Sequence, residues 1–402
     1  MNYSKVQFIS WELNTGPAKV IIPAAPSSPF ANLIKYYPGY SRSLDGRIDA
    51  LSQCIDINSR ISFTDDAISK AYDKSDKDPG TLKVFMAPEF LYRGAGGAYL
   101  HDLLNGWNGT APAEFNLPAT YNKWPGLFGG LQLIASNNKY NDWVFVFGTA
   151  ISASFTGVKT SDGLYVYDTD NAAEAYNTCL VQLGGVANIS TNYASRKQYI
   201  SNIDFLSETV DISHNTFSVK PLDDATIIPE DLFGVTEGGA IFTLENVNDS
   251  TGAPIKFGIE VCLDHARSGG DYANNYGRIR TANEYVKIQL VPSGGLSLED
   301  ASIRLLPAAG PTPHSYAFNC DGLNSLPITG LPSCHTQVWN GANGVQVPAA
   351  NKLFEANNGA ALANTTVVKV TDKVSIGTNI VDDNVFWQLG SGNVRLMPSL
   401  SL

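Results

Sequence analysis

The sequence has 402 residues, of which 44% are hydrophobic and 16% are charged, and its formal net charge is −11. A chain of this length and apolar content buries a sizeable core, while the surplus of acidic residues leaves no basic run to neutralise phosphates, which argues against a nucleic-acid partner. No stretch approaches 18 consecutive apolar residues, and the N-terminus lacks a basic region followed by an apolar one. Neither a membrane partner nor a signal peptide is therefore expected.

The five cysteines are odd in number and widely spaced, so they do not form a disulfide framework. At least one thiol is free in a monomer, and a reducing compartment, the cytoplasm, is therefore expected. The low-charge, Asn-rich composition also suits a protein exported without a Sec signal, and this alternative stays open.

Short apolar runs that alternate with helical and loop-like segments predict a layered α/β fold. In chain order, strands are expected at 6–11, 81–86, 143–151, 176–183, 240–244, 256–262 and 286–291. Helices are expected at 46–72, 126–140, 269–283 and 298–307. The long connections at 95–123 and 210–237 are rich in Gly, Pro, Asn and Asp, and we expect them to be insertions over the active site.

Strand-like runs at 366–370 and 385–389 predict a final hairpin or tail. No internal repeat, heptad run or low-complexity linker divides the chain. We therefore expect one domain over residues 1–325, with residues 326–402 as a C-terminal extension that packs on the same domain or at a subunit interface.

Three residues with catalytic potential follow or end apolar strands. Cys262 lies in FGIEVCLDH at 257–265, Glu89 closes VFMAPE at 84–89, and Lys197 lies in SRKQY at 195–199. A cysteine attacks as its thiolate and needs a base and a positive neighbour, which a glutamate and a lysine supply. Because catalytic groups in α/β folds gather at the carboxyl ends of strands, we expect these three side chains to meet.

The joint pattern resembles the nitrilase superfamily, the carbon–nitrogen hydrolases. APE at 87–89, SRK at 195–197 and GIEVCLD at 258–264 look like the glutamate, lysine and cysteine motifs of the family, and the similarity covers residues 3–325 with interruptions. The resemblance implies an α/β, four-layer-forming αββα sandwich without a cofactor or a metal. It also implies a homodimer or higher homo-oligomer that pairs through helices near the nucleophile.

The resemblance implies further site residues. Many members have another acidic residue after the lysine, and Glu208 is the first candidate, with Asp204 and Asp211 behind it. The backbone N–H of Leu263 would complete an oxyanion site with Lys197.

Two spacings differ from the usual pattern of the family. The 65 positions between the lysine and the cysteine indicate an insertion around 210–237. Arg267 stands five residues after Cys262, one later than the usual arginine.

The implied activity is hydrolysis of a non-peptide C–N bond through a cysteine thioester. The residues after the nucleophile, Leu263 and Asp264, are closer to the amidase-type Tyr-Asp than to the Trp-Glu of true nitrilases, which favours a small amide or carbamoyl-type substrate. Nitrile hydrolysis, acyl transfer and a binding module without catalysis stay open as alternatives.

Two other chemistries were weighed for Cys262. A zinc site with His265, Cys334 and His335 is disfavoured, because adjacent ligands rarely hold one ion and no Cys-x-x-Cys pair is present. A papain-like site would use His314 or His101 as its base, but neither has a supporting local signature.

Overall fold

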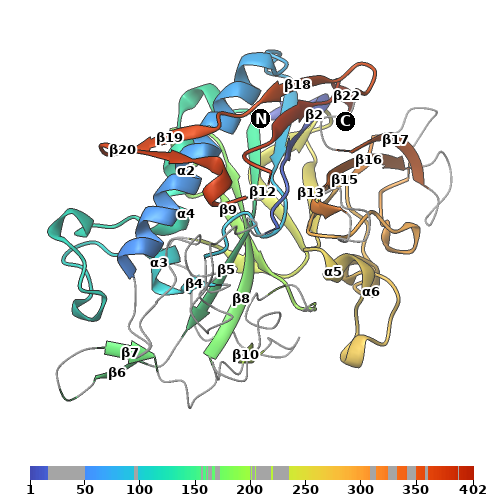
Figure 1. The fold of residues 1–402 in the computed structure, drawn as a ribbon. Helices are drawn as coiled ribbons and strands as arrows, with labels where there is room; N and C mark the ends of the chain where they lie inside the picture. Colours follow the sequence, from blue (N-terminus) through green and yellow to red (C-terminus); the bar gives the residue numbers. More distant parts are fainter. Residues whose placement is uncertain are drawn as a thin grey trace.

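The structure is a computed structural model, and it describes residues 1–16, 50–94, 98–154, 157–159, 161, 165–167, 173–199, 201, 204, 219–220, 235–307, 314–324, 333–341, 350–357, 361–387 and 389–402. These residues form a mixed α/β fold with two large β-sheets (Figure 1). Most of the predicted insertion at 210–237 lies outside the described residues.

The larger sheet has eleven strands within the described ranges, and its main path runs β11-β9-β8-β5-β3-β2-β21-β18. Its strands are β2 (Lys5–Glu12), β3 (Thr81–Met86), β4 (Tyr99–Leu100), β5 (Trp143–Ser154), β8 (Ala173–Leu183), β9 (Asn192–Arg196), β10 (Val219–Lys220), β11 (Glu237–Gly238), β18 (Thr366–Lys369), β21 (Asn393–Leu396) and β22 (Leu400–Ser401). Strands β2, β3 and β5 are parallel, while β8 and β9 continue the sheet in antiparallel pairs. The parallel strands bury apolar side chains on both faces, as Phe85 and Val84 of β3 do in two different clusters, which is typical of strands that are covered on both sides.

The smaller sheet has the order β1-β12-β13-β14-β15-β16-β17. Its strands are β1 (Asn2–Tyr3), β12 (Ile241–Asp249), β13 (Pro254–Ile259), β14 (Ile288–Ser293), β15 (Tyr316–Asn324), β16 (Ser333–Gly341) and β17 (Ala350–Asn357). Strands β13, β14 and β15 are parallel. Two separate hairpins pair β6 (Gly157–Lys159) with β7 (Tyr165–Tyr167) and β19 (Lys373–Ile376) with β20 (Asn379–Asp382).

The two large sheets pack face to face. One buried cluster joins Val84 of β3 to Ile259 of β13 and Ile288 of β14. The ring of Phe8 on β2 lies 5.0 Å from the ring of Phe318 on β15, measured between centroids. Burial of these large apolar side chains between the sheets is the main source of their association.

Helices cover the outer face of the larger sheet. They are α2 (Ala50–Lys74), α3 (Asp102–Asn105) and α4 (Gly126–Ala135), and in Figure 1 they lie together on one side of the sheets. Ile57 of α2 and Leu131 of α4 share a buried cluster with Phe85 and Phe145 of the sheet. The predicted helices at 46–72 and 126–140 are thus confirmed over most of their lengths.

The outer face of the smaller sheet is covered differently. The predicted helix at 269–283 is wrong, because the segment forms a 3₁₀ turn (Gly270–Tyr272) and the four-residue α6 (Arg278–Thr281). Its Gly and Asn residues favour turns over a helix. The helix at 298–307 is also wrong: beyond a 3₁₀ turn (Asp300–Ser302), Ile303 and Leu305 bury themselves in the cluster over this sheet.

All seven predicted strands overlap strands of the structure. The predicted strand at 256–262 ends earlier, at Ile259, because the chain turns sharply before the short helix α5 (Leu263–Ala266). At the C-terminus, β18 confirms the run at 366–370, whereas 385–389 forms no strand in its described part. There Phe386 and Trp387 instead pack into the helix-covered core, next to Phe63 of α2.

The C-terminal residues add strands to both sheets. Strand β16 pairs with β15, and β21 lies beside β2 with Leu396 opposite Ile9. The Arg395 guanidinium donates to both carboxylate oxygens of Glu12, at 2.5 and 3.1 Å, and both side chains are buried. Five strands of the described part of residues 326–402, β16, β17, β18, β21 and β22, therefore belong to the two large sheets, whereas β19 and β20 form a hairpin of their own.

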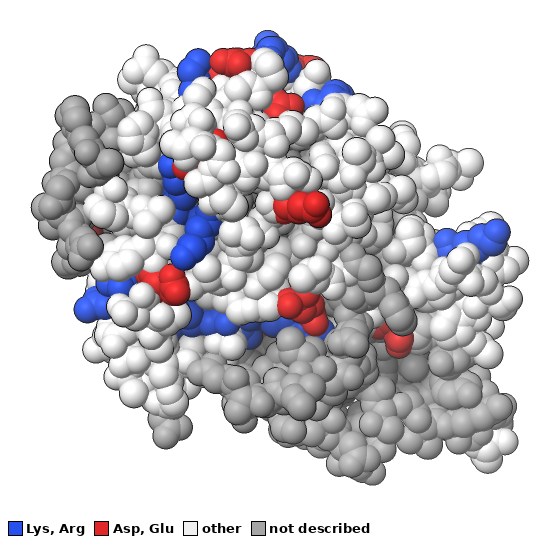
Figure 2. Space-filling view, turned by 180° about the vertical axis from the view of Figure 1, so that it is seen from behind, with Lys and Arg blue, Asp and Glu red and all other residues white. Residues whose placement is uncertain are grey.

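The face of the molecule shown in Figure 2 is weakly charged. On the face in Figure 2, uncharged atoms dominate the described surface, and a short band of Lys and Arg runs beside scattered acidic residues. None of the helices in the described ranges has both the length and the apolar run that a membrane span requires.

Candidate active site

The three candidate catalytic residues follow strands from both sheets. Glu89 comes three residues after β3 and Lys197 directly after β9, both in the larger sheet. Cys262 comes three residues after β13 in the smaller sheet. Their exposed fractions are 0% for Glu89, 2% for Lys197 and 5% for Cys262, so the three groups are withdrawn from bulk water.

The Lys197 ammonium lies between two carboxylates. Its Nζ is 2.9 Å from Glu89 Oε1 and 2.6 Å from Asp204 Oδ1, and all three side chains are fully buried. Asn177 on β8 also donates to Glu89 Oε1, at 2.8 Å. Two buried anions and one buried cation require close pairing, because an unpaired buried charge is strongly destabilising.

The Cys262 thiol completes the cluster. It lies beside the Glu89 carboxyl, close enough to lower the pKa of that group by hydrogen bonding. Within the part of the chain that the structure describes, the second carboxylate oxygen, Glu89 Oε2, has no hydrogen-bond partner. This oxygen is therefore available to the thiol and to a reacting molecule.

Burial and charge set the protonation states of the cluster. Burial raises the pKa of Glu89 to about 7, with a lowering effect from Lys197 and a further rise from Asp204. Burial also raises the pKa of the Cys262 thiol, against the effect of Lys197. For Lys197, burial alone would lower the pKa, but Cys262, Glu89 and Asp204 together raise it. Near neutral pH the resting site therefore holds a charged lysine, a protonated thiol and a glutamate able to exchange its proton.

The end of β14 and the residue after it contact both Glu89 and Cys262. The Cys262 N–H donates to Pro292 O at 3.0 Å, and the Glu89 N–H donates to Ser293 O at 3.2 Å. The next amide, the Gly294 N–H, hydrogen-bonds the Cys262 thiol and lowers its pKa. A Cβ on Gly294 would lie 2.6 Å from the Phe90 ring and 3.1 Å from Glu89 Oε2, so the backbone approaches here as only glycine allows. No sequence pattern pointed to this amide.

Cys262 itself has an unusual backbone conformation, with φ 48° and ψ −110°. Positive φ is uncommon for a residue with a Cβ and is found where the surrounding structure imposes it, often at functional sites. Leu263 begins α5 directly after this turn. The role of its N–H as an oxyanion donor stays a prediction.

The structure describes one of the three acidic candidates that follow Lys197. Glu208 and Asp211 lie outside the described residues, so the first candidate stays a prediction. Asp204, a candidate placed behind Glu208 in the sequence analysis, is the second carboxylate on Lys197, beside Glu89, and the Ser201 hydroxyl donates to it at 2.5 Å. Its spacing of seven residues from Lys197 gave no signal that separated it from its neighbours.

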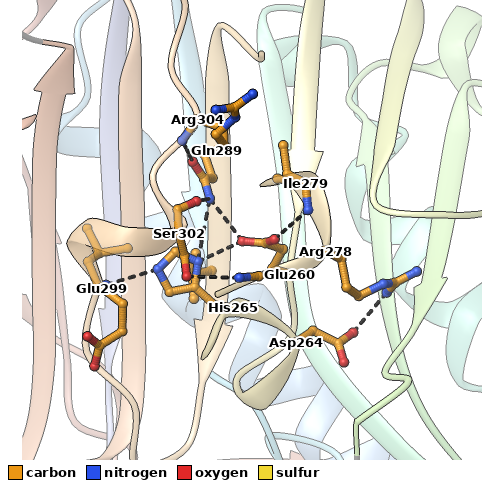
Figure 3. A network of polar contacts seen from close by, with 12 residues as sticks. Glu260, Asp264, His265, Arg278, Ile279, Gln289, Glu299, Ser302 and Arg304 are labelled. Atoms are coloured by element: carbon orange, nitrogen blue, oxygen red, sulfur yellow. Dashed lines mark hydrogen bonds and ion pairs between the residues drawn. The ribbon is translucent and has the colours of Figure 1, made fainter. Parts of the chain in front are cut away.

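His265 belongs to a structural network under the site (Figure 3). The Glu299 N–H donates to His265 Nε2 at 3.0 Å, so Nδ1 carries the proton and donates to Glu260 Oε2 at 2.6 Å. Glu260 also accepts from Gln289 and from the Ile279 N–H, at 2.9 and 2.8 Å. Both imidazole nitrogens are therefore occupied by protein groups, which leaves neither for a zinc ion.

The papain-like alternatives place no histidine on the thiol. His101 contacts the Ser152 hydroxyl at 3.0 Å and packs against the Tyr176 ring. Burial lowers its pKa to about 4, with a further effect from Arg196, which makes it a poor base. His314 lies two residues before Tyr316, which pairs with Ile288 at the start of β14, whereas Cys262 bonds Pro292 near the other end of that strand. Among the described residues, no three His, Cys, Asp or Glu side chains gather as a metal site would require.

Comparisons with known proteins add a loose structural likeness. No protein-family model matches the chain, and no curated protein matches it. Among solved structures, the chain is similar to Nit3 of Saccharomyces cerevisiae, described as a member of branch 10 of the nitrilase superfamily. The likeness covers 99% of this chain and 90% of that one, at 13% identity and a TM-score of 0.39. That protein belongs to the superfamily that the three sequence motifs resemble, but a match this loose leaves the contacts described above to carry the functional inference.

Proposed function

We propose that this chain is a cofactor-independent hydrolase of a non-peptide C–N bond, related to the nitrilases, in which Cys262 attacks an amide or carbamoyl-type carbon. The observation that carries the proposal is the meeting of Glu89, Lys197 and Cys262 in one buried cluster, although they come from different sheets. A base, a cation and a thiol in contact are the parts that thiol-dependent acyl chemistry needs.

The first half of the reaction forms a thioester. Cys262 Sγ attacks the carbonyl carbon while its proton passes to Glu89, and the Lys197 ammonium stabilises the oxyanion that develops. The C–N bond then breaks, and Glu89 returns the proton to the departing nitrogen, which leaves as ammonia or an amine.

The second half consumes water. Glu89 accepts a proton from the water that attacks the thioester carbon, and Sγ leaves and is reprotonated as the acid is released. A glutamate whose pKa burial raises to about 7 suits this alternation, because it accepts and donates a proton with little free-energy cost near neutral pH.

The test is intact-protein mass spectrometry during turnover, with ammonia release measured on a panel of amides, carbamoyl amino acids and nitriles. We expect an acyl adduct on Cys262 and no turnover by Cys262→Ala. The control is Cys54→Ala, which removes a buried thiol of α2 and should keep activity. Native turnover by Cys262→Ala would end the proposal.

The alternatives differ in their outcomes. A nitrile hydrolase would release ammonia from nitriles in preference to amides, and an acyltransferase would make an amide or ester when an amine or alcohol is added. A binding module without catalysis would show no faster alkylation of Cys262 by iodoacetamide than of the other thiols.

The remaining parts of the proposal are architectural and cellular. We propose a nitrilase-type αββα sandwich whose outer layer on the smaller sheet is thinned to α5, α6 and loops. We further propose that the chain forms a cytoplasmic homodimer or higher homo-oligomer and acts on a small molecule. Light scattering of the purified chain measures its oligomeric state directly.

A further inference from the structure

The distance between the thiol and its two partners depends on contacts between the sheets. Glu89 and Lys197 belong to the larger sheet, so hydrogen bonding within that sheet helps to fix their separation. Cys262 belongs to the smaller sheet. Apolar packing between sheets is not directional, and it alone does not fix a polar contact to a fraction of an ångström. Directional bonds across the sandwich are needed next to the site.

Asp264 makes such bonds. It lies two residues after Cys262, and its carboxylate accepts from the Gln198 N–H at 3.0 Å and from the Tyr199 N–H at 2.8 Å. These amides belong to the two residues that directly follow Lys197. The Asp264 side chain is fully buried, so water does not compete for these bonds. The turn that carries the thiol is thus joined to the segment that carries the lysine.

Arg278 of α6 holds Asp264 in place (Figure 3). Its Nη1 is 2.8 Å from Asp264 Oδ2 and 3.5 Å from the Arg196 carbonyl oxygen. Arg278 therefore contacts both the turn after Cys262 and the strand before Lys197. Its side chain is 9% exposed, so the ion pair is largely shielded from solvent.

Arg267, the arginine that sequence spacing brings closest to Cys262, does not take this role. It is partly exposed and donates to Asn275. The guanidinium that serves Asp264 instead comes from 14 residues beyond it in the sequence.

We propose that Asp264, held by Arg278, is the positioning residue that sets the Cys262 thiol against Lys197 and Glu89. The inference rests on the proposed function, since it assigns a purpose to the geometry of that same site. Neither residue touches the reacting atoms. Loss of either would let the turn at Cys262 shift relative to Lys197, and a misplacement of about 1 Å can lower a rate by up to about 100-fold.

The test compares Arg278→Met with Arg267→Met, the same change in the neighbouring arginine. The rate of Cys262 alkylation by iodoacetamide is followed by peptide mass spectrometry near neutral pH, and the melting temperature of each variant is recorded. We expect Arg278→Met to slow alkylation of Cys262 by about 10- to 100-fold and Arg267→Met to keep the native rate. Once a substrate is identified, kcat should fall while KM changes little.

Two further variants guard against misfolding. Arg278→Lys keeps the charge but not the planar fork, so an intermediate rate is expected. Asp264→Asn keeps the size of the side chain and should behave like Arg278→Met. If iodoacetamide alkylates Cys262 at the native rate in a folded variant of either residue, the inference is overturned and the proposed function stays intact. If Cys262 of the native chain reacts no faster than the other thiols, the proposed function fails, and the inference with it.

Discussion

Asp204→Asn should move the pH dependence of Cys262 reactivity to lower pH. Because the resting thiol is protonated, it reacts after its proton passes to Glu89, so the acid limb of the profile follows the ionisation of Glu89. Burial raises the pKa of Glu89 to about 7, and the negative charge of Asp204 contributes to the rise. Asparagine removes that charge at nearly constant size, so the pKa of Glu89 should fall.

The magnitude follows from the two contacts of Lys197. Glu89 Oε1 and Asp204 Oδ1 lie 2.9 and 2.6 Å from the same Nζ, so these two oxygens are at most about 5.5 Å apart. At an effective dielectric constant of about 20, two like charges at that separation repel by roughly 3 kcal/mol. That energy corresponds to about two pH units in the midpoint of the acid limb.

The assay is alkylation by iodoacetamide at a series of pH values, with Cys262 quantified by peptide mass spectrometry. Ser201→Ala is the control, because it removes the hydroxyl that donates to Asp204 without changing any charge, and its midpoint should stay in place. An acid limb that does not move in Asp204→Asn, or that moves to higher pH, would refute the electrostatic reasoning.

Two further predictions concern stability. Lys197→Met leaves Glu89 and Asp204 buried without their cation, so we expect the free energy of unfolding, measured in urea, to fall by about 3–5 kcal/mol. Glu89→Gln should be equally inactive as an enzyme but should not show this loss of stability. Arg395→Met should lower the free energy of unfolding by about 3–5 kcal/mol, because it removes the guanidinium from the buried Glu12 carboxylate. The double variant with Glu12→Gln should recover part of this loss, and an unchanged unfolding midpoint in Arg395→Met would contradict the role given to this ion pair between β2 and β21.

Local sequence signals predicted the strands well and the helices unevenly. The run at 81–86 is buried along its whole length, and its bounds were predicted without error, because a parallel strand covered on both faces is rich in apolar residues, here Leu82, Val84, Phe85 and Met86. The apolar residues at 298–307 are also buried, but they pack on the smaller sheet in a mostly extended segment and not in a helix. A short apolar run does not by itself distinguish these two conformations.

The strands outside the predicted set illustrate a second limit. β9, which ends directly before Lys197, was not predicted, although its residues are all buried. The sequence NYASR mixes small, polar and charged side chains, and Arg196 is buried through its ion pair with Glu237 of β11. Only a partner distant in the sequence makes such a residue suitable for an interior strand.

The sequence by itself determined which residues are chemically equipped for the site: a thiol and a carboxylate that each follow an apolar strand, and an ammonium in the SRK run at 195–197. Composition and strand patterning suffice for this because they are local properties. Only the tertiary structure decided which groups surround them: Asp204 on the lysine, the Gly294 amide on the thiol, and Arg278 rather than Arg267 on Asp264. Each contact depends on how the chain folds after a strand: Asp204 lies seven residues from Lys197, Arg278 lies 14 residues from Asp264, and Gly294 follows β14, the neighbour of β13. Sequence spacing does not encode which side chain or amide of such loops reaches which partner.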